Sequence, residues 1–248
     1  KSKLQCTQRE VWNLMASFAG PNLEVDGLVL CLDAANTQSY PGSGTTWTDI
    51  SGKGNDGTLT NGATFNSDNM GRIVFDGTND YVDITSLPVI SDTSAMTMEA
   101  WVNVDNLDNT FQVVGTWERT TRHWQFSYSG NSSYNLNMSI AGSGYSVGTT
   151  AAPATGVWQC VAVTFTGGGE SSFHTGNTSI YVNAVSQSIQ NTGSTGTSGN
   201  DSYIGTRQGF AASNFLDGSI ALISYYDKAL TETEIKQNYN SHKGRFGL

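Results

Sequence analysis

From residue 26 onward, short apolar runs alternate with polar stretches that are rich in glycine, serine and threonine. Within the run 96–104, successive side chains fall on opposite faces of an extended chain, which is the period of a β-strand. By this pattern we predict strands at 28–33, 72–76, 81–84, 96–104, 112–117, 123–128, 134–140, 158–165, 179–183, 201–205 and 218–226. Many short strands separated by turn signals predict an all-β fold of two packed antiparallel sheets.

One helix is marked near the end of the chain. Thr231 and Glu234 have the spacing of a capping box, in which a hydroxyl and a carboxylate satisfy free amides of the first turn. Leu230 and Ile235 are placed to pack against each other around it as a hydrophobic staple. We predict a helix over 232–241 that ends by Gly244 in a left-handed cap.

The first twenty residues have a helical pattern of apolar positions, unlike the strand pattern of the rest. Val11, Met15 and Phe18 recur at helical spacing, and Gly20-Pro21 then breaks the pattern. We divide the chain into an N-terminal arm or short helix at 1–25 and one β domain at 26–248. The arm either anchors the domain to a larger assembly or caps one end of the sandwich.

Composition agrees with a β fold and narrows the partners. The 248 residues include 28 glycines, 4 prolines and only 13% charged residues, which suits strands joined by polar turns. The formal net charge of -9, without a basic stripe, argues against nucleic acid, and no apolar run approaches membrane-spanning length. Cys31 and Cys160 lie in apolar runs and are predicted to be buried thiols, so no disulfide framework is expected.

Several motifs occur in an order that resembles a known family. Phe75-Asp-Gly-Thr-Asn-Asp-Tyr-Val82, Met96-Thr-Met-Glu-Ala-Trp-Val102 and Gly156-Val-Trp-Gln-Cys-Val-Ala-Val-Thr-Phe165 precede a tail that runs from Phe215 into the helix. Together they resemble the concanavalin A-like, laminin-G-like jelly roll over roughly residues 26–240. The fold class expected is therefore a two-sheet jelly-roll sandwich with a short C-terminal helix and an N-terminal arm.

A narrower resemblance appears at both ends of that span. The segments 27–36, 47–59 and 237–248 look like those of lectin-like domains in structural proteins of marine tailed phages. This resemblance implies a non-catalytic virion structural or decoration domain on the particle surface. Its partners would be other virion subunits, contacted through the arm in a homo-oligomer or a larger assembly. The alternative is a calcium-dependent adhesin that binds host glycan, on a virion or otherwise at an extracellular cell surface.

Two loops are rich in the oxygen donors that Ca²⁺ prefers. Family members often hold a calcium near such loops, and the resemblance assigns a structural Ca²⁺ to Asp49, Asn55, Asp76, Asn79 and Asp80. Many relatives carry an aspartate where this chain has Ala221, which removes one carboxylate from the pattern. The alternative is that these side chains only stabilise turns between strands.

Carbohydrate sites stack a ring on the apolar face of a sugar and fix its hydroxyls with polar groups. Two tryptophans flank the polar segment 118–123, which is also rich in positive charge. The residues predicted to bind carbohydrate are Trp117, Arg119, Arg122, Trp124 and Tyr128. The alternative is that the two tryptophans are core residues at strand ends.

Glucanases share this fold, which raises the question of hydrolysis. A retaining glycosidase needs two carboxylates about 5 Å apart, commonly on alternate residues of one strand. Glu99 is alone in its strand, and Glu232 and Glu234 are explained by the start of the helix. We therefore expect no enzymatic activity.

Overall fold

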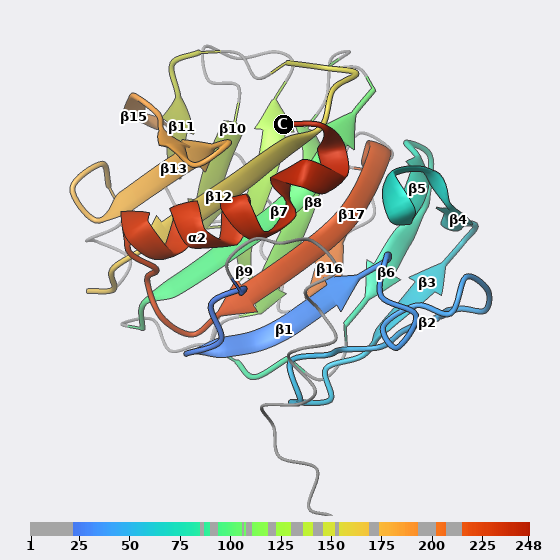
Figure 1. The fold of residues 1–248 in the computed structure, drawn as a ribbon. Helices are drawn as coiled ribbons and strands as arrows, with labels where there is room; N and C mark the ends of the chain where they lie inside the picture. The colour runs from blue at the N-terminus through green and yellow to red at the C-terminus, as the bar shows by residue number, and fades with distance from the viewer. Residues whose placement is uncertain are drawn as a thin grey trace, which may run out of the picture.

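The computed structural model describes residues 22–84, 87–89, 94–105, 107, 111–118, 123–129, 136–140, 146–151, 154–168, 174–192, 202–206 and 215–248. The predicted arm lies outside these residues except for 22–25. Two antiparallel sheets are packed face to face, and one helix lies across the outside of one of them (Figure 1). The predicted two-sheet sandwich is confirmed.

Sheet A has eight strands in the order β14-β13-β12-β7-β17-β5-β4, with β1 also paired to β17. Their bounds are β1 Leu28–Asp33, β4 Thr64–Asn66, β5 Arg72–Asp76, β7 Met96–Val104, β12 Gln159–Phe165, β13 Thr178–Val182, β14 Val185–Ser186 and β17 Asp217–Tyr226.

Sheet B has nine strands in the order β15-β11-β10-β9-β8-β16-β6-β3-β2. Their bounds are β2 Thr46–Trp47, β3 Gly57–Thr60, β6 Tyr81–Asp83, β8 Phe111–Glu118, β9 His123–Ser129, β10 Leu136–Ile140, β11 Ser146–Thr149, β15 Ile189–Thr192 and β16 Tyr203–Ile204. A short 3-10 helix, η1 (Asp68–Met70), precedes β5.

The core lies between the two sheets and draws apolar side chains from both. Met98 and Val163 of sheet A and Phe126 and Met138 of sheet B belong to one buried cluster. Alternate residues of the longer strands point into this cluster because of the two-residue period of a strand. The strands that the sequence did not predict are short or polar, namely β2, β3, β4, β11, β14 and β15.

Helix α2 (Glu232–His242) begins as predicted. Thr231 Oγ1 accepts from the Glu234 N–H, and the Glu234 carboxylate accepts from the Thr231 N–H. Its end differs from the prediction, because the chain continues into the 3-10 helix η4 (Lys243–Phe246) and the left-handed residue is Gly247, with φ 73°. Gly244 is therefore not the cap. The extra turn places Phe246 on the ring of Trp101, with centroids 4.2 Å apart, and this contact explains why the chain stays coiled.

Candidate functional site

The three aromatic residues predicted to bind sugar lie in the core. Trp117 and Trp124 are fully buried, and Tyr128 is 1% exposed. The Trp117 ring stacks on Tyr225 at 5.2 Å, and the Trp124 ring lies 5.0 Å from Phe165. A ring held between the two sheets offers no face to a sugar, so the structure corrects this prediction in favour of the core alternative. Arg119 and Arg122 lie outside the described residues.

The predicted calcium ligand Asp49 is saturated by the protein itself. Its Oδ1 accepts from the N–H groups of Cys31 (2.9 Å) and Ser51 (2.8 Å). Its Oδ2 accepts from the Ser51 hydroxyl (2.7 Å) and the Asn55 N–H (3.0 Å). A carboxylate offers about four lone-pair positions, and all are used. The metal role predicted for Asp49 is therefore corrected to a structural one.

The loop around Asp49 closes the outer edge of β1. Asn55 Nδ2 donates to the Val29 carbonyl at 2.6 Å, and the Ile50 N–H donates to the Cys31 carbonyl at 2.9 Å. An edge strand otherwise presents free backbone groups to solvent or to another chain. Asn55 thus also has a structural contact in this loop.

The remaining predicted ligands, Asp76, Asn79 and Asp80, lie far from Asp49. Cys31, which contacts Asp49, pairs with Ser224, whereas Asp76 pairs with Asp217. These two positions on β17 are about 23 Å apart at 3.3 Å per residue. The five predicted ligands therefore do not form one site.

The loop 76–80 has one feature that fits a cation. Asp80 Oδ2 accepts from the Asp76 N–H at 3.1 Å, but Asp80 Oδ1 is buried and has no hydrogen-bond partner among the described residues. Burial, and then the nearby charge of Asp76, raise the pKa of the Asp80 carboxyl. Asn79 is exposed at the turn, and within the described ranges no three His, Cys, Asp or Glu side chains converge as a metal cluster. Calcium at this loop stays a prediction.

The missing aspartate at Ala221 does not bear on that loop. Ala221 is fully buried with Trp101, Cys160 and Leu222 on the outer face of sheet A. It lies four residues along β17 from Asp217, the residue that pairs with Asp76. A carboxylate there would face an apolar cluster instead of the 76–80 turn.

The outer face of sheet A is closed. Helix α2 lies across it (Figure 1). Trp101 is covered by Tyr239 of α2 and Phe246 of η4, whose rings stack on it at 5.6 and 4.2 Å. Arg245 of η4, 8% exposed, adds an ion pair to Asp33 at 2.7 Å. This apolar surface is occupied by the chain's own C-terminal segment and offers no ligand site.

The outer face of sheet B is polar. Strand register places the side chains that point away from the core in two rows across β8, β9, β10 and β11. One row pairs Thr116 with Gln125, Gln125 with Ser139, and Ser139 with Ser146. The second pairs Ser127 with Asn137 and Asn137 with Gly148. Amide and hydroxyl groups that gather in this way are suited to the hydroxyls of a sugar.

This polar face is covered in the free protein and incompletely satisfied. The six polar side chains of the two rows are at most 2% exposed, although they point away from the core. Gln125 Nε2 donates to the Ser127 hydroxyl at 3.2 Å. The hydroxyl of Ser139 is buried and has no hydrogen-bond partner among the described residues. A buried polar group without a partner costs free energy, and a ligand can supply that partner.

Sequence reasoning missed these rows although the signal was present. Gln125 and Ser127 alternate with the aromatic residues 124, 126 and 128, and Asn137 and Ser139 alternate with apolar residues 136, 138 and 140. The predicted strands contain both sets of residues, but the sugar-binding prediction rests on the aromatic residues and not on the polar ones between them.

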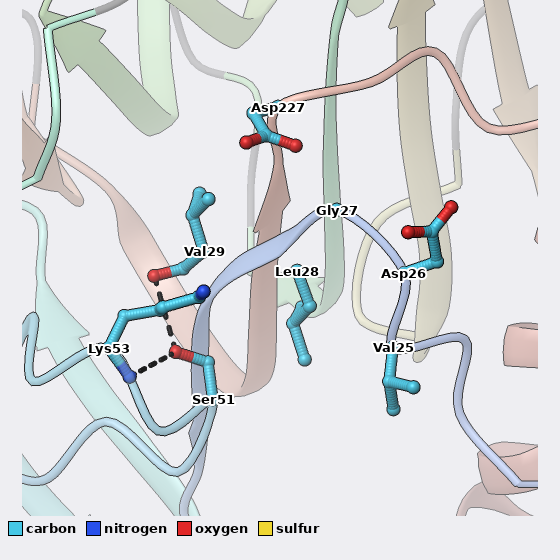
Figure 2. A pocket seen from close by; sticks show the side chains of 8 residues that line it. All are labelled: Val25, Asp26, Gly27, Leu28, Val29, Ser51, Lys53 and Asp227. Atoms are coloured by element: carbon cyan, nitrogen blue, oxygen red, sulfur yellow. Dashed lines mark hydrogen bonds between the residues drawn. The ribbon is translucent and has the colours of Figure 1, made fainter.

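A hollow of about 450 Å³ lies where β1 begins and β17 ends (Figure 2). It is lined by Val25, Asp26, Gly27, Leu28, Val29, Ser51, Lys53 and Asp227. Asp26 is paired with Lys228 at 2.8 Å, and the Ser51 hydroxyl is bonded to Asp49 and to the Val29 carbonyl. None of the eight lining residues is aromatic, so this hollow provides no ring on which a sugar could stack.

Comparison with known proteins places the fold in a family. A family model described as the concanavalin A-like lectin/glucanases superfamily matches residues 76–236. This chain belongs to that superfamily. A search of curated proteins finds no match.

Solved structures share this lectin-like fold at low identity. Trypanosoma rangeli sialidase in complex with sialic acid is 18% identical, with a TM-score of 0.62, and the match covers 96% of this chain and 38% of the sialidase. The binding domain of Paraclostridial Mosquitocidal Protein 1 is 16% identical, with a TM-score of 0.63, over 88% of this chain and 52% of that one. Domain 4 of AbnA, a GH43 extracellular arabinanase from Geobacillus stearothermophilus, in complex with arabinotriose, is 16% identical with a TM-score of 0.57 over 87% of this chain and 100% of that domain.

These likenesses show the fold alone. The lectin-like chain spans 38% of the sialidase, so the activity of that enzyme does not transfer to it. The marine phage resemblance has no counterpart in the matches described above and rests on the sequence motifs alone. Within the described part of the chain, no helix has the length and apolar character needed to cross a membrane.

Proposed function

We propose that this chain is a non-catalytic carbohydrate-binding domain whose ligand contacts the polar outer face of sheet B. The observation that carries the proposal is the buried Ser139 hydroxyl, which lacks a partner among the described residues and sits among the amides of Gln125 and Asn137. The fold supports it, since the matched structures include an arabinanase domain in complex with arabinotriose and a toxin binding domain. The glycan-binding alternative therefore has support that the virion decoration role lacks.

Binding requires an opening of this face. Ser139 and Asn137 are each 1% exposed in the free protein, so a saccharide has to gain access before it can bond to them. Association that waits on a conformational change is slower than about 10⁵ M⁻¹s⁻¹. We expect slow association with an observed rate that levels off at high ligand concentration.

The test is a glycan array with the purified protein, including arabino-oligosaccharides and sialylated glycans, in calcium and in chelator. If the wild type binds a glycan, the same measurement on Ser139→Ala tests whether the site is on the outer face of sheet B. Because the hydroxyl has no partner among the described residues of the free protein, Ser139→Ala should leave the melting temperature unchanged or raise it. It should weaken glycan binding about 2- to 10-fold, the equivalent of one hydrogen bond.

Asn240→Ala, on the exposed surface of α2, is the matched control and should bind as the wild type does. Wild-type protein that binds no glycan would refute the proposed function and leave the assembly role as the better account. Binding that Ser139→Ala does not weaken would show that the ligand site lies elsewhere.

A further inference from the structure

A buried carboxyl connects helix α2 to sheet A. Glu99 of β7 points away from the core toward α2 and is only 1% exposed. Its Oε2 accepts from Asn238 Nδ2 of α2 at 3.0 Å, and its Oε1 accepts from the Cys160 thiol of β12 at 3.5 Å. A carboxyl in this position has two neutral donors and little water.

The same group of hydrogen-bonded side chains also binds residues 22–26, which precede β1. Asn238 Nδ2 also donates to the Tyr226 hydroxyl at 3.0 Å, and Asn238 Oδ1 accepts from the Glu24 N–H at 2.7 Å. The Tyr226 hydroxyl in turn donates to the Glu24 carbonyl at 3.1 Å. Glu99, Asn238 and Tyr226 thus join β7, α2, β17 and residues 22–26 in one buried network.

The groups that face Glu99 supply no positive charge. Cys160 of β12, Tyr226 of β17 and Cys31 of β1 are each buried acids, and burial raises the pKa of each. The carboxylate of Glu24 turns to its own neighbours, where it accepts from the N–H groups of Val25 and Asp26. His242 of α2 lies beside Asp33 and Arg245.

We infer that α2 and residues 22–26 form a proton-controlled joint on sheet A, closed while Glu99 carries a proton and weakened when Glu99 is ionised. An ionised Glu99 would be a buried charge with no cation against it among the described residues, and release of the helix would hydrate it. The joint therefore holds this end of the chain more tightly in acid than at neutral or alkaline pH.

The direction follows from proton linkage. Burial raises the pKa of the Glu99 carboxyl from 4.5 to about 7, an effect that the two donors only partly offset. Between these values the opened state loses its proton first, so rising pH favours opening, and the effect levels off above about pH 7. If Glu99 regains an ordinary pKa on opening, the open fraction rises about 25-fold between pH 5.5 and pH 8.

Hydrogen exchange followed by mass spectrometry tests this on the whole protein. After correction for the intrinsic exchange rate, peptides covering 22–27 and 232–248 should lose protection at pH 8 relative to pH 5.5. Peptides from β8 to β10 should not. Glu99→Gln keeps the shape and the acceptor for Asn238 without the charge, so it should lack the loss of protection that the wild type shows at pH 8.

Glu232→Gln removes an exposed carboxylate from the same helix and should keep the wild-type pH response. Burial also lowers the pKa of His242, so protonation of His242 in acid favours opening, which is opposite to the effect of Glu99. The wild type and both variants contain His242, so its contribution cancels when they are compared. If Glu99→Gln fails to fold, infrared spectra of the wild type at pH 6 should still show a protonated carboxyl that is lost by pH 8. Equal pH dependence in the wild type and Glu99→Gln, or no protonated carboxyl at pH 6, would overturn the inference.

Discussion

At the scale of single residues, the buried polar side chains separate into those that the protein satisfies and those that it does not. Asp49 accepts four hydrogen bonds from its own loop and from β1, so the acceptor positions of its carboxylate are all occupied. Ser139 Oγ and Asp80 Oδ1 are buried, and neither has a partner among the described residues. Unsatisfied buried groups cost free energy, so they mark the places where a ligand or an ion would add most.

We expect Asp49→Ala to destabilise the protein by about 3 kcal/mol, because it leaves several buried N–H groups without an acceptor. The free energy of unfolding from urea titrations measures this. Asp227→Ala, at an exposed carboxylate, is the control and should lie within about 0.5 kcal/mol of the wild type. A loss in Asp49→Ala that appears only in the presence of calcium would instead make Asp49 a metal ligand.

At the scale of elements, the C-terminal segment is fastened by one arginine. Arg245 of η4 pairs with Asp33 of β1 at 2.7 Å, and its Nε donates to the Asn69 carbonyl of η1 at 2.6 Å. Its Nη2 donates to the Gly71 carbonyl as well. A single guanidinium thus ties η4 to β1 and to the chain before β5, because its five donors reach acceptors in several directions.

Replacing Arg245 with methionine should cost about 3–5 kcal/mol, since it leaves Asp33 and several carbonyls without their donor. Chemical denaturation monitored by circular dichroism measures the change. Lys236→Met, which breaks an exposed ion pair with Glu232 on α2, should cost less than about 1 kcal/mol. Similar losses in the two variants would mean that the Arg245 contacts contribute no more than a surface pair.

At the scale of the whole molecule, the two sheets depend on one core. The largest buried cluster takes residues from both sheets, including Trp117 and Trp124 of sheet B and Tyr225 and Phe165 of sheet A. Neither sheet can bury its apolar face without the other. We therefore expect a single unfolding transition.

Calorimetry tests this through the ratio of the calorimetric to the van't Hoff enthalpy, which should be close to one. Trp117→Leu would lower the single transition temperature without splitting it, because the cavity weakens the shared core. Two resolved transitions in the wild type would show that the sheets, or the α2 region, unfold independently.

Sequence alone was sufficient for the elements with strong local patterns. The alternation in Met96–Val104 and the apolar run Leu28–Asp33 predicted strands with the observed bounds. The capping box predicted the start of α2 at Glu232. These features depend on neighbours within a few residues, which the sequence displays directly.

Only the tertiary structure decided what faces what. The sequence placed Trp117 and Trp124 on strands, but whether they met a sugar or the opposite sheet depended on how sheet B packs against β17 and β12 of sheet A. The sequence also showed oxygen donors in two loops, but it did not show that these loops are roughly 23 Å apart along β17. Residues far apart in the chain form the polar rows around Ser139, the closed face under α2 and the buried network around Glu99. Strand order and packing bring these residues together, and local sequence patterns do not encode either.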